Sequence, residues 1–82
     1  MNKIRLLFFA TLRERAGVKS LDLEIPEEMT VRGLKEKLAA EYPSLGESLK
    51  SVLITINREY AFDEAVIPPG AEMALFPPVS GG

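Results

Sequence analysis

Cysteine, histidine and tryptophan are all missing from this chain of 82 residues. Without them the chain has no thiol nucleophile, no imidazole base and none of the usual nitrogen or sulfur ligands of zinc. Disulfide bonds are excluded too, so the fold must rest on its packed core alone. Any chemistry in which this chain takes part must therefore use another kind of group.

Long hydrophobic runs and an excess of charge of one sign are also absent. The apolar stretches 6–10 and 52–56 are far shorter than the ~20 residues that a membrane helix requires. Ten Lys and Arg against twelve Asp and Glu give a net charge of −2, without the basic excess that nucleic acids attract. Charged residues at 13–15 interrupt the signal-like N-terminus, and no small-residue cleavage site follows. We expect a cytoplasmic protein that binds neither nucleic acid nor membranes.

The remaining composition is typical of one small globular unit. Hydrophobic residues make up 46% of the chain and charged residues 27%, which speaks against disorder. A core of this size leaves little room for an internal cofactor cavity, so we expect no bound cofactor or metal. We expect residues 1–76 to form a single domain and residues 77–82 to form an extended C-terminal tail.

Alternation of apolar and polar residues predicts two antiparallel strands, at 3–12 and 21–25, and the loop 13–19 between them can hold a turn of helix. Thr30 is a suitable N-cap for a helix that Pro43 ends. The apolar stripe of this helix consists of Val31, Leu34, Leu38 and Tyr42. Later segments are a helical turn at 44–50, a strand at 52–56, a hairpin into a short strand at 60–61, and a last strand at 72–76.

This order of segments predicts an α+β fold, a mixed sheet of about five strands with one main helix packed on one face. The opposite face has nothing to cover it. If Met73 and Leu75 point to the core, strand parity turns Phe76 outward, and it places Phe9 on the same open face. Tyr60 can lie near both after its hairpin. Parity alone leaves open whether a loop or the tail covers these rings, but their position next to the tail favours a docking surface.

The C-terminal tail holds the most unusual group of the chain. Pro77 and Pro78 fix an extended backbone and remove two strand donors, so the tail should leave the sheet. Gly81 and Gly82 have no Cβ, which lets a slender end enter a narrow channel in a partner. Adenylation would activate the α-carboxylate of Gly82, and sulfide transfer would then give a thiocarboxylate. A terminal Gly-Gly alone is weak evidence; the missing Cys and His, the Pro-Pro exit and the aromatic residues beside it make the case.

Segments along the whole chain carry a resemblance to a known family. They are Leu7-Phe8-Phe9-Ala10, Leu12-Arg13-Glu14, Ala16-Gly17, Asn57-Arg58-Glu59-Tyr60 and the ending Ala74-Leu75-Phe76-Pro77-Pro78-Val79-Ser80-Gly81-Gly82. The sequence resembles the small subunit of molybdopterin synthase, a sulfur-carrier family with the ubiquitin-like β-grasp fold. One departure lies in the turn before the last strand, where many members have an acidic residue and this chain has Ala71.

The resemblance implies a role for each part of the chain. An activating enzyme related to those of ubiquitin would adenylate Gly82 with ATP, and Gly82 would then carry the thiocarboxylate, with Gly81 matching the family ending. The tail, with Pro77, Pro78, Val79 and Ser80, would enter the large synthase subunit of a heterotetramer, whose own groups catalyse sulfur transfer to a cyclic pyranopterin precursor. The product is the dithiolene of molybdopterin. Phe9, Tyr60 and Phe76 would dock on the partner.

Three other functions remain open on the sequence. The chain could donate sulfur for thiamine or another sulfur metabolite, although the Pro-Pro-Val-Ser lead-in favours molybdopterin. It could instead be a protein modifier that forms an amide with lysines of other proteins through Gly82. It could also be an interaction module with an inert tail. The charged segments 13–15 and 35–37 are interpreted as solvated surface.

Overall fold

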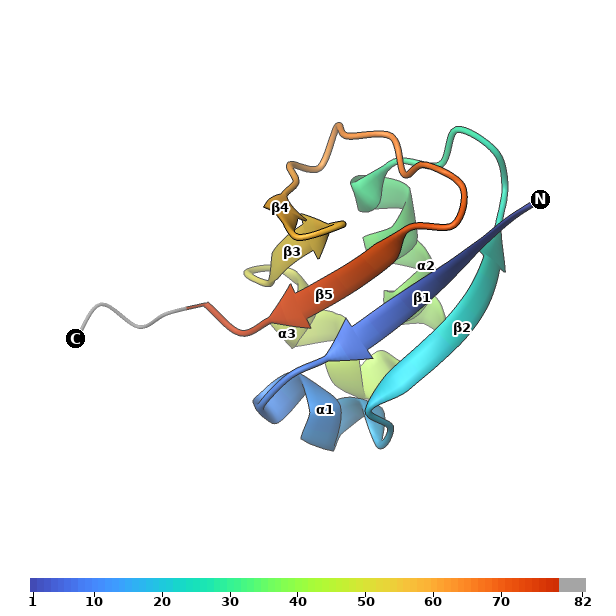
Figure 1. The fold of residues 1–82 in the computed structure, drawn as a ribbon. Coiled ribbons are helices and arrows are strands. Elements are labelled where there is room, and N and C mark those ends of the chain that lie inside the picture. Colours follow the sequence, from blue (N-terminus) through green and yellow to red (C-terminus); the bar gives the residue numbers. More distant parts are fainter. Residues whose placement is uncertain (79–82) are drawn as a thin grey trace.

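Five strands form one mixed sheet in the computed structural model, which describes residues 1–78 (Figure 1). They are β1 (Asn2–Phe8), β2 (Ser20–Ile25), β3 (Leu53–Ile56), β4 (Glu59–Tyr60) and β5 (Glu72–Phe76). Their order across the sheet is β2-β1-β5-β3-β4. The central strands β1 and β5 run parallel, and every other neighbouring pair is antiparallel. The first and last strands of the chain therefore lie side by side in the middle of the sheet.

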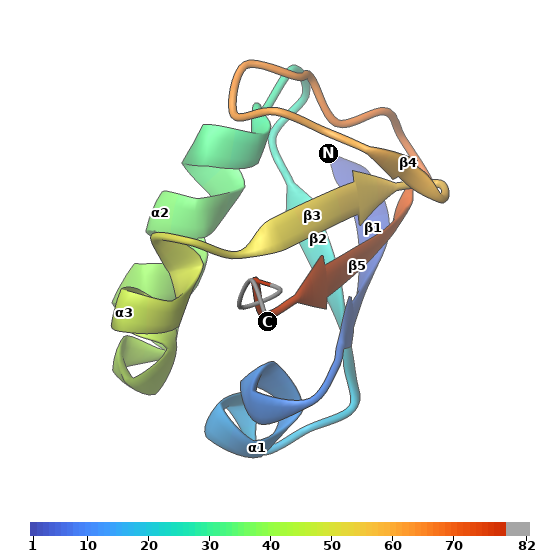
Figure 2. The same ribbon diagram turned by 90° about the vertical axis from the view of Figure 1, so that its left-hand side faces the viewer.

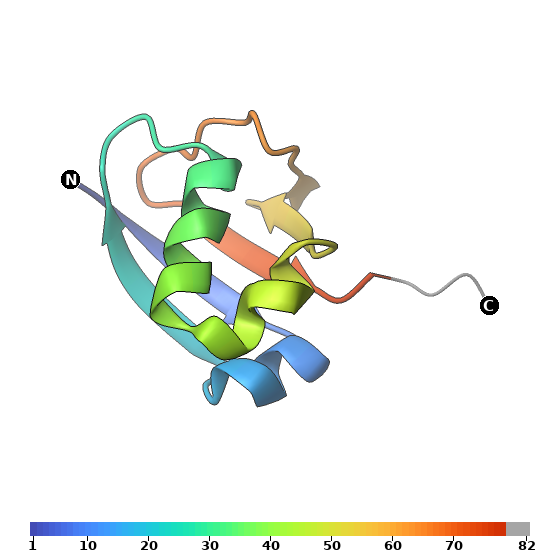
Figure 3. The same cartoon turned by 180° about the vertical axis from the view of Figure 1, so that it is seen from behind.

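The helices lie on one side of this sheet. They are α1 (Thr11–Ala16), α2 (Val31–Glu41), the 3-10 turn η1 (Pro43–Leu45) and α3 (Gly46–Leu49). Figure 2 shows α2 and α3 beside the sheet, and Figure 3 shows α2 lying across it, with α1 at one end. This arrangement confirms the predicted α+β class with one main helix on one face. Among residues 1–78, no helix has the length and apolar character needed to cross a membrane.

The core lies between the sheet and α2 and follows the predicted alternation. β1 contributes Ile4, Leu6 and Phe8, and β5 contributes Met73 and Leu75, all of them buried. The stripe of α2 that meets them consists of Val31, Leu34 and Leu38. Each such side chain contributes about 1.5–3 kcal/mol when it is fully buried. Because these residues take up the face toward α2, their neighbours along each strand must point to the other face.

The first turn of α2 is completed by its own cap and by a distant loop. The Thr30 side-chain oxygen accepts a hydrogen bond from the backbone N–H of Gly33 at 3.2 Å, which confirms Thr30 as the N-cap. The backbone N–H groups of Val31 and Arg32 donate to carbonyl oxygens of the loop 61–67 at 3.0 Å each. These bonds satisfy donors that have no partner within the helix. The loop is thereby attached to the start of α2.

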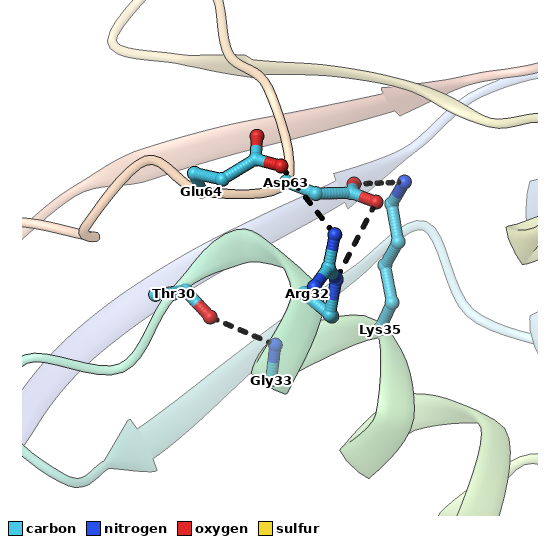
Figure 4. Close-up of polar contacts among 6 residues, drawn as sticks. All are labelled: Thr30, Arg32, Gly33, Lys35, Asp63 and Glu64. Carbon is cyan, nitrogen blue, oxygen red and sulfur yellow. Dashed lines mark hydrogen bonds and ion pairs between the residues drawn. The ribbon is translucent and has the colours of Figure 1, made fainter.

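Side chains strengthen the same attachment (Figure 4). Lys35 Nζ lies 2.6 Å from Asp63 Oδ1, and Arg32 lies within 3.4 Å of a Glu64 oxygen. The hydrogen bond from Lys35 lowers the pKa of the Asp63 carboxyl below its ordinary value. The loop that follows β4 is therefore attached to α2 through both its backbone and its acidic side chains. These contacts hold the loop in place.

Several predicted boundaries need correction. β1 ends at Phe8 instead of continuing to residue 12, because Ala10 adopts a φ of 53° and a ψ of −130° that turn the chain into α1. The helical turn expected within 13–19 is thus α1, which begins at Thr11. α2 ends at Glu41, so Tyr42 lies just past the helix, and Pro43 begins the 3-10 turn. The short strand β4 begins one residue earlier than expected, at Glu59.

Candidate functional site

The open face of the sheet carries apolar side chains at the end from which the tail departs. The strand register pairs Phe76 of β5 with Leu53 of β3. On the other side of β5, Phe8 pairs with Leu75 in the parallel ladder. The next residues along, Phe9 and Phe76, are therefore neighbours on the face away from α2. Parallel pairing of the first and last strands is what brings these two rings together.

Phe9 and Phe76 stack on each other. Their ring centroids are 4.7 Å apart and the ring planes differ by 11°. The backbone N–H of Phe9 donates to the carbonyl oxygen of Leu75 at 3.2 Å, which extends the ladder one residue past the end of β1. Phe9 is 40% exposed and Phe76 is half-buried. The stack thus forms an aromatic platform that solvent still reaches, at the last residue of β5.

Tyr60 lies on the same face but does not join this stack. It pairs with Thr55 of β3, so β3 separates its strand from β5. Its side chain is 74% exposed. The structure therefore brings Phe9 and Phe76 into contact and places Tyr60 across the sheet from them, at the β4 edge.

Sequence reasoning missed Phe62, which is 82% exposed, more than any other large hydrophobic side chain in the described part of the chain. Together with Leu53 and Tyr60 it lines an open groove of about 660 Å³. Phe62 lies past the end of β4, where strand parity gives no direction. The available signal was a single aromatic residue directly before two acids, Asp63 and Glu64.

The other end of the open face is polar. Arg5 Nε lies 2.9 Å from Asp22 Oδ1, across the pairing of β1 with β2. The hydrogen bond between them raises the pKa of Arg5 and lowers the pKa of Asp22. Glu72 of β5 pairs with Arg5 on the side of β1 opposite to Asp22. The apolar half of the face is thus the half beside the tail.

Ala71 lies in the turn before β5, at the position where the sequence resemblance leads us to expect an acidic residue in many members. It is 1% exposed, and its carbonyl oxygen accepts a hydrogen bond from the Arg5 backbone at 3.0 Å. The preceding Gly70 has a φ of 72°, which a glycine adopts without strain. The turn before the last strand is therefore closed by a small residue packed into the core.

The tail leaves the sheet at the stack. β5 ends at Phe76, Pro77 is half-buried and Pro78 is exposed. The other predicted tail residues, Val79, Ser80, Gly81 and Gly82, lie outside the described residues. Within residues 1–78, no cluster of three or more acidic, Cys or His side chains is placed to hold a metal ion. The described part of this site is an apolar aromatic surface at the point where the chain leaves the sheet.

Comparison with known proteins identifies the family. The model of the ThiS family matches residues 6–82. The chain belongs to the ThiS family. The match includes residues 79–82, which the structure does not describe.

Individual relatives agree with this assignment. The molybdopterin synthase sulfur carrier subunit of Arabidopsis thaliana is 38% identical over 80 residues, which cover 98% of this chain and 83% of the relative. The protein of the same name from Homo sapiens is 30% identical, with 98% of this chain and 94% of the relative covered. These relatives confirm the resemblance to the small subunit of molybdopterin synthase.

Solved structures agree on the fold. The crystal structure of SAMP1, small archaeal modifier protein 1, from Haloferax volcanii superposes with a TM-score of 0.83 at 28% identity. The match covers 98% of this chain and 99% of that protein. The predicted ubiquitin-like β-grasp fold is confirmed.

Proposed function

We propose that this chain is the sulfur carrier subunit of molybdopterin synthase and that the carboxylate of Gly82 is its reactive group. The observation that carries the proposal is the position of the Phe9–Phe76 stack directly before Pro77. A partner that binds the aromatic platform is thereby placed at the start of the tail. The names of the relatives and the absence of Cys and His from the sequence support the same function.

The chemistry of the carrier takes place at the carboxylate. An adenylating enzyme transfers AMP from ATP to this group, with release of pyrophosphate, and the mixed anhydride is a far better electrophile than a carboxylate. A sulfur nucleophile then forms the C–S bond and displaces AMP, which leaves a thiocarboxylate. The thiocarboxylate sulfur then bonds to a carbon of the cyclic pyranopterin precursor and displaces an oxygen substituent there. Water cleaves the resulting thioester, which leaves the sulfur on the precursor and returns the carboxylate.

The folded body acts as the part that partners hold. In this proposal Phe9, Phe76 and Tyr60 dock on the large synthase subunit, while residues 77–80 lead Gly81 and Gly82 into its active site. Aromatic side chains are enriched at the centre of such interfaces. The catalytic groups for sulfur transfer belong to the large subunit, and a cytoplasmic location remains part of the proposal.

The first experiment is intact-mass analysis of the chain after incubation with ATP, a sulfur source and the adenylating enzyme. The expected product has one oxygen replaced by sulfur, at the C-terminal residue. Addition of the large subunit and the pyranopterin precursor should return the chain to its original mass as the dithiolene forms. Retention of sulfur at this second step would instead indicate another acceptor, such as a thiamine precursor.

A second candidate function is the modification of other proteins, and the likeness to SAMP1 favours it. The same adenylate would then react with a lysine amine in place of sulfur and form an amide. Incubation with a cell extract and ATP should in that case yield higher-mass conjugates with a Gly82–lysine link. A chain whose mass changes in neither experiment would be an interaction module with an inert tail.

A further inference from the structure

Ala10 adopts a backbone conformation that glycine normally supplies. Its φ of 53° and ψ of −130° match the first central position of a type II′ turn. The backbone N–H of Leu12 donates to the Phe9 carbonyl oxygen at 3.1 Å and closes this turn. Gly is strongly preferred at this position because a Cβ there crowds the backbone.

No contact within residues 1–78 explains why this position holds alanine in place of glycine. The residue is exposed, so its methyl group is not part of the packed core. Alanine has a lower unfolded-state entropy than glycine, which favours folding. At a positive φ, however, the strain that alanine adds to the folded state is larger than this gain. The methyl group therefore costs stability in the free chain, and strained residues of this kind are found mainly at functional sites.

The strained residue lies directly beside the aromatic platform. Ala10 follows Phe9, whose ring stacks on Phe76 at the start of the tail. The other positive-φ residues that are not glycine, among residues 1–78, are Glu28, Asn57 and Arg58. Glu28 lies between β2 and α2, near Ile25, which pairs with Asn2 at the opposite end of β1 from Phe9. Among these four positions, Ala10 is the one next to the stack.

We propose that the methyl group of Ala10 is a contact for the large synthase subunit, which buries it in an apolar pocket together with the edge of Phe9. This inference rests on the proposed function. An apolar pocket is the matching chemistry because the methyl group and the two stacked rings have no polar atoms. The partner thus uses a side chain that the free chain keeps at the expense of its own stability.

The test compares Ala10→Gly with the wild-type chain in calorimetric titrations into the large subunit. Loss of one buried methyl group should weaken binding about fourfold. The melting temperature of Ala10→Gly should be equal to or higher than that of wild type, because glycine relieves the strain. The ring proton shifts of Phe9 and Phe76 should stay unchanged, which shows that the stack is intact.

Glu28→Gly is the matched control, because it removes a side chain at a φ of 64° from an exposed residue outside the docking surface. It should raise the melting temperature and leave the affinity for the large subunit unchanged.

Equal affinities of Ala10→Gly and wild type would overturn the assignment of Ala10. A weaker affinity accompanied by loss of the ring shifts would overturn it too, since Ala10 would then act by positioning Phe9. Failure of the wild-type chain itself to bind the large subunit would instead refute the proposed function, and with it this contact.

Discussion

Phe9 directly follows β1 and Phe76 ends the neighbouring strand β5, and their rings stack with centroids 4.7 Å apart. The pair joins β1 to β5 on the face that α2 leaves open. An aromatic contact of this kind contributes about 0.5–1.5 kcal/mol beyond the area that it buries. The same two rings are thus expected to stabilise the free chain and to bind the partner.

This double role can be separated with a double-mutant cycle. Phe9→Ala and Phe76→Ala should each destabilise the chain, and the double variant should lose less than the sum by about 0.5–1.5 kcal/mol. Chemical denaturation gives these values. In titrations with the large subunit, Phe76→Ala should weaken binding by about 1–3 kcal/mol. Unaltered binding by Phe76→Ala would remove this ring from the docking surface.

Deletion of Gly82 should abolish sulfur transfer and leave folding intact. The residue lies beyond the last strand, which ends at Phe76, and chain termini outside the fold contribute little to stability. Thiocarboxylate formation by mass analysis and thermal unfolding give the two results. Gly82→Ala is the companion variant, because it keeps the carboxylate but adds a Cβ that a narrow channel should reject. A large drop in melting temperature on deletion would show that the tail supports the fold.

The stability of the chain should depend on pH through Asp63. Lys35 lowers the pKa of Asp63 in the folded chain, so the pair stabilises the fold above the unfolded pKa, which is about 4. This contribution is lost as the pH falls through the lower, folded pKa. Asp63→Asn should therefore cost at most about 1 kcal/mol at neutral pH, because the pair is partly exposed, and less in acid.

Denaturant titrations of both chains between neutral and acidic pH measure this difference. Lys35→Met removes the same ion pair from the other side and should show the same convergence in acid. A difference between Asp63→Asn and wild type that stays constant down to the lowest pH would exclude this ionisation as its cause.

The hairpin between β3 and β4 stores removable strain. Arg58 has a φ of 74°, in the left-handed region that glycine prefers at this turn position. Arg58→Gly should stabilise the chain by about 0.5–1 kcal/mol and raise the melting temperature by roughly 4 °C. Arg58→Ala keeps the strained backbone and should not stabilise the chain. Equal gains from both variants would mean that the arginine side chain, and not the backbone, was unfavourable.

Strand alternation was enough to predict which side chains face the core and which face outward. Leu75 and Phe76 were assigned to opposite faces from parity, and the structure agrees, because alternation is a local property of every strand. Thr30 and Pro43 likewise marked the limits of α2 to within two residues, since capping and the missing proline N–H act on their own neighbours.

The pattern failed where tertiary contacts decide the backbone. Nothing in the sequence indicates that Ala10 takes a φ of 53°, because alanine on its own avoids that region. The reversal at Ala10 is imposed by the ladder that holds Phe9 and by the start of α1. The exposure of Phe62 was missed for a related reason, because its place depends on the bonds from α2 to the loop 61–67.

The central position of β5 has a consequence for the synthesis of the protein. Its neighbours β1 and β3 cannot pair through it until residues 72–76 have left the ribosome. A prematurely terminated chain that lacks β5 would have a gap between two unpaired strand edges, which is a substrate for chaperones and proteases.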